Sequence, residues 1–163
     1  MKTLRVLYFC LCFFLLSALS FELSFAADSA TPTRTTIHQP TSFFKGVEQI
    51  TFTFSSTDGT VERNANWSVA GVTGFIMKFH YIPDGTNTPD AAADIQVFPS
   101  LTGGVNLLYG ACDNVGATET IGFPAEAING GPVFLANDTL YFYAGSLGAG
   151  TNGGVLHLYI LNP

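Results

Sequence analysis

An acidic stretch between residues 84 and 94 carries oxygen ligands of the kind that a hard cation needs. Asp84, Asn87, Asp90 and Asp94 lie within these eleven residues, and Ca²⁺ is held by carboxylate, amide and carbonyl oxygens. Their spacing is not that of an EF-hand loop. The stretch therefore predicts either a calcium site or a solvated loop in which Asp and Asn side chains cap turns.

Aromatic side chains alternate with aliphatic ones in the last two extended segments, residues 139–144 and 154–161. If these segments pair as a hairpin with their aliphatic residues in the core, the intervening side chains point outward together. The sequence then predicts one exposed patch, suited to a sugar ring or a protein partner. The alternative is that the leader, a loop or a neighbouring subunit covers this surface. The predicted patch consists of Tyr141, Tyr143, His157 and Tyr159.

Motifs for catalysis are not found in the sequence. It contains no G-x-S-x-G elbow and no H-x-H or HExxH spacing, the patterns expected of a nucleophilic serine or a zinc site. Glu62, Glu119 and Glu126 fit a glycosidase only by residue type. We predict that the protein is not an enzyme and has no cofactor other than the calcium considered above. A hydrolase with a cryptic site is the alternative.

In the segments that position these residues, apolar and polar side chains alternate with a period of two. This pattern is typical of strands with one buried face. Ile50, Phe52 and Phe54 are expected to point inward, as are the alternate residues of the segment from Phe75 to Tyr81. Glycine-rich turns separate the extended segments. The pattern predicts an all-β fold, a two-sheet antiparallel sandwich or jelly roll of about eight strands. Further strand candidates are residues 67–69, 95–97, 105–109, 118–123 and 132–135.

The N-terminus has the layout of a secretory signal peptide. Lys2 and Arg5 precede an apolar run over residues 6–19, and Ser24-Phe25-Ala26 offers small residues for cleavage after Ala26. We predict a secreted protein, extracellular or periplasmic; an uncleaved membrane anchor is the alternative. Residues 27–42, rich in Thr and Pro, are predicted to be a flexible or extended leader, and residues 43–163 a single β domain.

Cleavage would change both the charge and the cysteine content. Residues 27–163 keep 11 of the 12 acidic and 4 of the 6 basic side chains, a net charge of −7. The absence of a basic cluster argues against nucleic acid and, after cleavage, against a membrane surface as partners. Cys112 would be left without an intrachain partner, so we expect it to be buried or to join two chains.

The C-terminal segment resembles small jelly-roll proteins of tailed bacteriophages, of the decoration or tail-accessory kind. The residues that carry the resemblance are Asn137-Asp138-Thr139-Leu140 and the stretch from Gly153 to Leu161. The resemblance implies a structural surface subunit without catalytic residues. Together with the composition, it predicts an exported, non-enzymatic assembly or surface-interaction subunit. Its partner would be a second copy in a homo-oligomer or another surface protein, and in the carbohydrate-binding alternative a glycan.

Overall fold

The structure is a computed structural model of the 163-residue chain, and it describes residues 28–38, 46–124 and 132–163. The predicted signal peptide, residues 1–26, lies outside the described residues. Strands account for nearly all of the regular structure, which confirms the prediction of an all-β fold. In chain order the elements are β1 (Ser29–His38), β2 (Val47–Ser56), the short 3-10 helix η1 (Ala65–Trp67), β3 (Ser68–Pro83), β4 (Asp94–Phe98), β5 (Thr120–Gly122), β6 (Val133–Gly145) and β7 (Asn152–Leu161).

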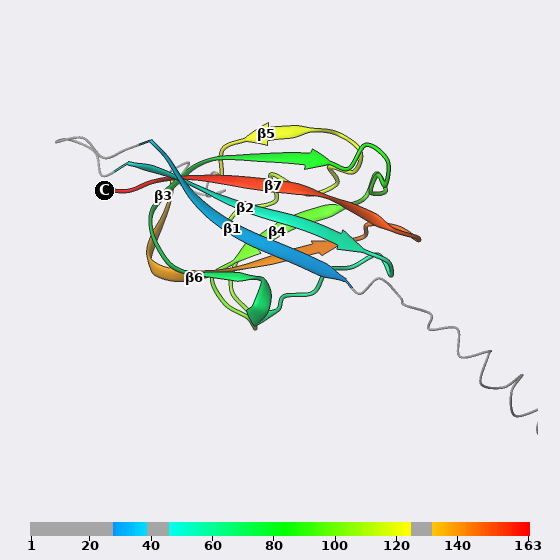
Figure 1. Cartoon of the computed structure of the whole chain (residues 1–163), viewed down its shortest axis with the longest axis horizontal. Coiled ribbons are helices and arrows are strands. Elements are labelled where there is room, and N and C mark those ends of the chain that lie inside the picture. The colour runs from blue at the N-terminus through cyan, green and yellow to red at the C-terminus, as the bar shows by residue number, and fades with distance from the viewer. Residues whose placement is uncertain (1–27, 39–45, 125–131) are drawn as a thin grey trace, which may run out of the picture.

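The seven strands of the described chain form one antiparallel sheet. Its order is β1-β2-β7-β3-β6-β4, and β5 pairs with the second half of β3. Figure 1 shows β1, β2, β7 and β3 running side by side, with β5 beyond β3. The finer predicted form, a two-sheet sandwich or jelly roll, stays a prediction.

The core lies on the inner side of this sheet, which curls so that distant strands face one another. The ring centroids of Phe52 on β2 and Phe142 on β6 are 5.3 Å apart, and those of Phe54 and Phe142 are 4.9 Å apart. Two other strands separate β2 from β6 in the sheet, so these rings meet across the core. The outer sides of β2 and β6 therefore point away from each other. As predicted, the inward residues Ile50, Phe52 and Phe54 are buried.

Strand β3 contains a bulge that reverses part of the predicted inward face. The register with β7 shifts between Ile76 and Lys78, so Met77 is an extra residue without a partner. An extra residue of this kind changes which side chains face inward. Ile76 and Phe79 are both buried, whereas Met77, predicted to point inward, is exposed. Simple alternation from Phe75 to Tyr81 was therefore wrong in its first half.

The segment predicted to be a flexible leader contributes a strand. Ser29–His38 form β1 and pair with β2 along their length. The segment has few apolar residues, but threonine favours extended backbone, and pairing with β2 needs only main-chain groups. Ala30 also reaches the core. The extended backbone agrees with one form of the prediction, but the expected start of the domain at residue 43 was wrong, because it weighed side-chain burial alone. Residues 27 and 39–42 lie outside the described chain.

The segment after β4 is built of turns and covers the outer edge of that strand. The main-chain nitrogen of Leu107 donates to Val97, and that of Ile95 donates to the carbonyl of Cys112. Tyr109 and Asn114 have positive φ angles of 49° and 54°, which an extended strand does not allow. The strand predicted at residues 105–109 is therefore wrong.

Candidate functional site

The predicted aromatic patch is divided by the topology of the sheet. Strands β6 and β7 do not pair as a hairpin, because β3 lies between them. Tyr141 and Tyr143 project outward from β6, whereas His157 and Tyr159 project from β7, next to β2. Because the outer sides of β2 and β6 point away from each other, the two pairs do not form one surface. The alternation was nevertheless right, since the intervening residues of both strands are buried.

The β7 pair belongs to a polar row that crosses the sheet. Oγ1 of Thr51 on β2 lies 2.8 Å from Nδ1 of His157, and Nε2 of Gln49 donates to the hydroxyl of Tyr159 over 3.3 Å. The ammonium group of Lys78 lies 5.3 Å from the centre of the Tyr159 ring, within the range of a cation–π interaction. These groups are half-buried and already engaged with one another.

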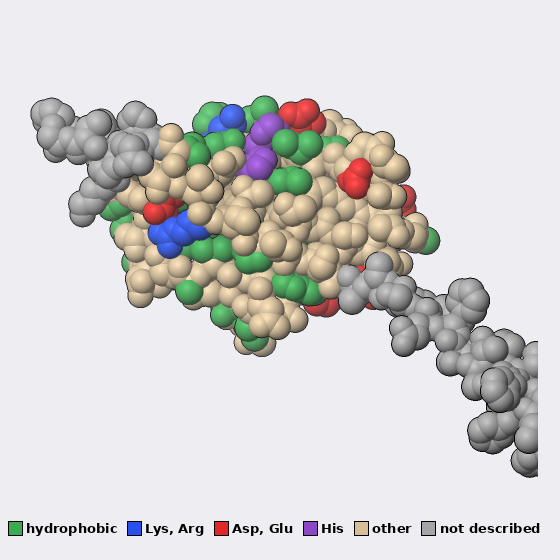
Figure 2. Space-filling model, viewed as in Figure 1, with side chains coloured by type: hydrophobic (Ala, Val, Ile, Leu, Met, Phe, Trp, Pro, Cys, Tyr) green, Lys and Arg blue, Asp and Glu red, His purple; other side chains and the backbone are tan. Residues whose placement is uncertain are grey.

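A second histidine continues the row on β3. His80 is the register partner of His157, and their ring centroids are 5.9 Å apart. Nε2 of His80 lies 2.6 Å from Oε1 of Glu119. Burial, and then the nearby charge of His80, lowers the pKa of His157, which favours its neutral form. Figure 2 shows histidine side chains gathered near the upper edge of this face.

The β6 pair has a different environment. Tyr143 makes an edge-to-face contact with Phe98 at 6.4 Å between ring centroids, and the guanidinium of Arg63 lies 3.9 Å from the centre of the same Phe98 ring. Burial, and then the charge of Glu62, raises the pKa of Tyr143. This tyrosine packs on an aromatic and charged cluster beside β4.

Two of the four residues of the predicted calcium site, Asp84 and Asp94, already accept hydrogen bonds from main-chain nitrogens. Oδ1 of Asp84 accepts hydrogen bonds from the main-chain nitrogens of Thr86 and Asn87, and these bonds lower the pKa of Asp84. Asp94 accepts one from the nitrogen of Asn114. A calcium ion would have to compete with these donors. Within residues 28–38, 46–124 and 132–163, no group of three or more His, Cys, Asp or Glu is arranged to hold a metal ion.

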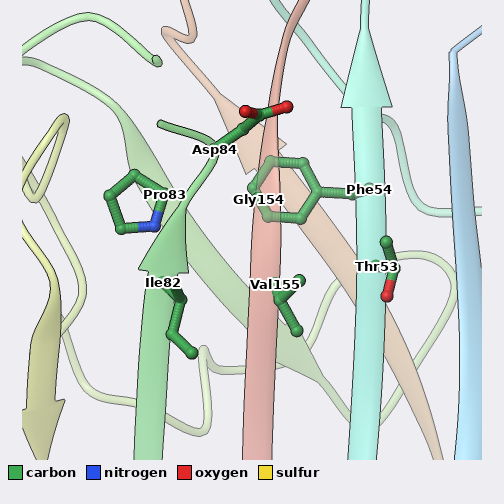
Figure 3. Close-up of a pocket in the computed structure, with 7 residues that line it drawn as sticks. All are labelled: Thr53, Phe54, Ile82, Pro83, Asp84, Gly154 and Val155. Carbon is green, nitrogen blue, oxygen red and sulfur yellow. The ribbon is translucent and has the colours of Figure 1, made fainter. Parts of the chain in front are cut away.

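A small open pocket of about 190 Å³ lies at one end of the polar face. Figure 3 shows the Phe54 ring beside Gly154, with Thr53, Val155 and Ile82 around it. A Cβ at Gly154 would lie 2.7 Å from the carbonyl oxygen of Ile82 and 3.3 Å from Cζ of Phe54, so a larger residue there would displace groups that line the pocket. Its lining is mainly apolar and includes none of the predicted patch residues.

An exposed apolar surface that the sequence did not predict lies around the middle of β3. There the pairing of β3 with β6 ends and its pairing with β5 begins. Phe75 on β3 and Phe134 on β6 are register partners with ring centroids 4.9 Å apart. The bulge residue Met77 follows on β3 and is 42% exposed. Phe134 is 52% exposed, although both phenylalanines belong to strands with a buried face. The sequence predicted Phe75 and Met77 to be core residues.

Strand β5 extends this surface. A Cβ on Gly122 would lie 2.5 Å from Cζ of Phe79 in the core, so Gly122 faces inward and its two neighbours face outward. These neighbours, Ile121 and Phe123, are 56% and 71% exposed. The signal available in the sequence was the glycine between two large apolar residues. We call the whole set the apolar patch: Phe75, Met77, Ile121, Phe123 and Phe134.

In the part of the chain that the structure describes, no helix is both long and apolar enough to cross a membrane. Comparison with known proteins finds no family model, no curated protein and no solved structure that matches the chain.

Proposed function

We propose that the protein is an exported, non-enzymatic β protein that works as an assembly subunit. A second copy of the chain associates with it through the apolar patch. The observation that carries the proposal is the clustering of large exposed apolar side chains around β5, with Phe123 the most exposed of them. The signal-peptide pattern of residues 1–26 supports export.

The physical argument begins with the cost of leaving such a surface in water. Transfer of apolar surface out of water is favourable by about 25 cal/mol per Å². Single exposed apolar residues are common, but contiguous sets mark interaction sites. The apolar patch combines the half-buried Phe75 with four exposed side chains from β3, β6 and the β5 segment, where Phe123 directly follows the strand. An association that covers them is therefore favoured.

The composition of the apolar patch supports a protein partner, and specifically a second copy. Sugars and phosphates present polar groups whose hydrogen bonds an apolar surface cannot replace. A second copy carries the same apolar surface, and two-fold pairing of identical surfaces is the commonest form of oligomer. The carbohydrate-binding alternative was based on one aromatic patch, and it has less support because β3 lies between the strands that carry the predicted patch residues.

The test is the size of the predicted mature chain, residues 27–163, measured by analytical ultracentrifugation over a range of concentrations. We expect the wild-type chain to form a dimer or larger oligomer. Phe123→Ser and Phe134→Ser should each shift the equilibrium toward the monomer, because each places a hydroxyl in the contact. The exposure of both side chains keeps the cost to the fold small.

The matched control is Val105→Ser. Val105 is 62% exposed and lies in the turn segment after β4, away from the apolar patch. This variant should assemble like the wild type. A wild-type chain that stays monomeric at the highest concentration, or equal dissociation of the Val105 variant, would reject the proposal.

A further inference from the structure

The two opposed histidines of the polar face provide a pair of metal-binding side chains. His80 and His157 stand directly opposite each other on neighbouring strands, and their ring centroids are 5.9 Å apart. Two imidazoles that share one tetrahedral Zn²⁺, each at about 2.0–2.1 Å from the ion, place their centroids about 5 Å apart. Small side-chain rotations would bring the two rings to that separation.

Each ring is held at one nitrogen and has no partner at the other within the described chain. Oε1 of Glu119 lies 2.6 Å from Nε2 of His80, and Oγ1 of Thr51 lies 2.8 Å from Nδ1 of His157. When these nitrogens carry the hydrogen and donate it, lone pairs remain on Nδ1 of His80 and Nε2 of His157. Histidine ligands of metals are usually oriented in this way, by a carboxylate or another oxygen at the second ring nitrogen.

We propose that His80 and His157 bind one divalent transition-metal ion, with Zn²⁺ as the representative. The ligand atoms are Nδ1 of His80 and Nε2 of His157. Glu119 and Thr51 are positioning residues that hold the rings and select their tautomers. This site shares no residue with the apolar patch, but it lies beside it, since His80 is the register partner of Ile121.

The chemistry of the pair suits such an ion. Imidazole nitrogen is a good ligand for Zn²⁺, Cu²⁺ and Ni²⁺ but a poor one for Ca²⁺ and Mg²⁺. Burial, and then the nearby charge of His80, lowers the pKa of His157, which favours the neutral form that binds metals. Two protein ligands are one fewer than a catalytic zinc site supplies, so water fills the remaining positions and the ion is exchangeable.

The experiment is a calorimetric titration of the whole chain with Zn²⁺ in a Cys10→Ser, Cys12→Ser background. This background removes the two thiols outside the described residues. We expect one ion per chain, with His80→Gln and His157→Gln each abolishing the binding. Glu119→Gln and Thr51→Val should retain the binding but weaken it by about 10–100-fold, the usual effect of losing a partner of a histidine ligand.

The matched control is His38→Gln, which removes the third histidine of the chain and should bind Zn²⁺ as the wild type does. NMR of the imidazole nitrogens adds a readout that a structural role would not move. On adding Zn²⁺, Nδ1 of His80 and Nε2 of His157 should shift. The absence of binding, unchanged affinity in both His80→Gln and His157→Gln, or loss of binding in His38→Gln would overturn the proposal.

Discussion

The two outer edges of the sheet, β4 at one end and β1 at the other, are protected by different means. At β4, the main chain of residues 106–115 runs along the edge and exchanges hydrogen bonds with it, among them Leu107 to Val97 at 2.7 Å and Ile95 to Cys112 at 2.9 Å. The side-chain oxygen of Asn106 also accepts a hydrogen bond from the nitrogen of Val97. Backbone groups of this edge are therefore satisfied by the chain itself.

At β1, within the described residues, protection comes from side chains. The guanidinium of Arg34 pairs with Glu48 on β2 and donates to the carbonyl oxygens of Ala70 and Gly71 at the beginning of β3, over 3.4 and 3.3 Å. Pro32 interrupts the row of main-chain donors, as proline often does at sheet edges. One exposed cation thus links β1 to a strand three positions further along the sheet order.

The contrast between the two edges predicts where the fold opens first. Segments with buried apolar contacts and satisfied backbone groups open at a high free-energy cost, whereas solvent-exposed edges open locally at a low one. The segment that covers the β4 edge contributes the fully buried Leu108 and Cys112 to the core. The β1 edge has a polar strand whose residues 31 and 33–37 are exposed. We expect stability to be concentrated at β4.

The largest effect is expected for Leu108→Ala. Leu108 is fully buried in the covering segment, and truncation of such a leucine costs about 2–5 kcal/mol, since it loses transfer free energy and leaves a cavity. Urea denaturation followed by tryptophan fluorescence gives the free energy of unfolding, and its decrease in the variant measures this loss of stability. Leu101→Ala, at a 40% exposed position in the preceding turn, is the control and should change stability by no more than about 0.5 kcal/mol. Equal losses in both variants would contradict the comparison.

The next prediction, of intermediate size, concerns how fast a thiol reagent labels Cys112 in the covering segment. Burial, and then the charge of Asp113, raises the pKa of Cys112 to about 12, so very little of the thiol is ionised at pH 8. The thiolate is the reactive form. In a Cys10→Ser, Cys12→Ser background, a thiol reagent should therefore label the folded chain very slowly and the urea-unfolded chain quickly.

Asn106→Ala should accelerate this labelling. The side-chain oxygen of Asn106 accepts hydrogen bonds from the nitrogens of Val97 and Leu108, and leaving such donors unpaired costs about 1–3 kcal/mol. If labelling follows opening of the covering segment, the rate should rise about 5–150-fold. Fast labelling of the wild type, or an unchanged rate in the variant, would show that the segment does not protect the β4 edge.

The sequence predicted which side chains face inward better than it predicted which strands pair. Alternation identified the inward residues of β2, β6 and β7 because a strand has one buried face whatever its neighbours are. It could not show that β3 lies between β6 and β7, since a period of two determines a face and not a pairing partner. The bulge at Met77 and the turn conformations of Tyr109 and Asn114 depend on contacts with other segments. Strand β1 was missed because its stability comes from the main chain of β2.

For the site, the sequence predicted the outward direction of His157 and Tyr159 correctly, but it could not place His80 opposite His157. That contact depends on the register between β3 and β7, which the bulge sets. The apolar patch was missed for a related reason. Ile121 and Phe123 look like core residues until Gly122 is seen to face the ring of Phe79.

The smallest effect is expected for Arg34→Ala at the β1 edge. The Arg34 side chain is 37% exposed, so solvent screens its pairing with Glu48. Exposed pairs of this kind typically contribute about 0.2–1 kcal/mol. A double-mutant cycle with Glu48→Gln should give a coupling energy in that range at low salt and a smaller one in 1 M salt, where the screening length falls to about 3 Å.

Hydrogen exchange would then locate the effect of Arg34→Ala. Because the arginine holds β1 against the beginning of β3, its loss should speed exchange of the β1 amides by about fivefold at most, the equivalent of about 1 kcal/mol. The amides of Ile95 and Val97 on β4 should keep their wild-type rates, because their partners belong to the covering segment. A loss of stability as large as that of Leu108→Ala, or faster exchange at β4, would mean that the two edges share one cooperative unit. Their protection would then be equivalent despite the different contacts.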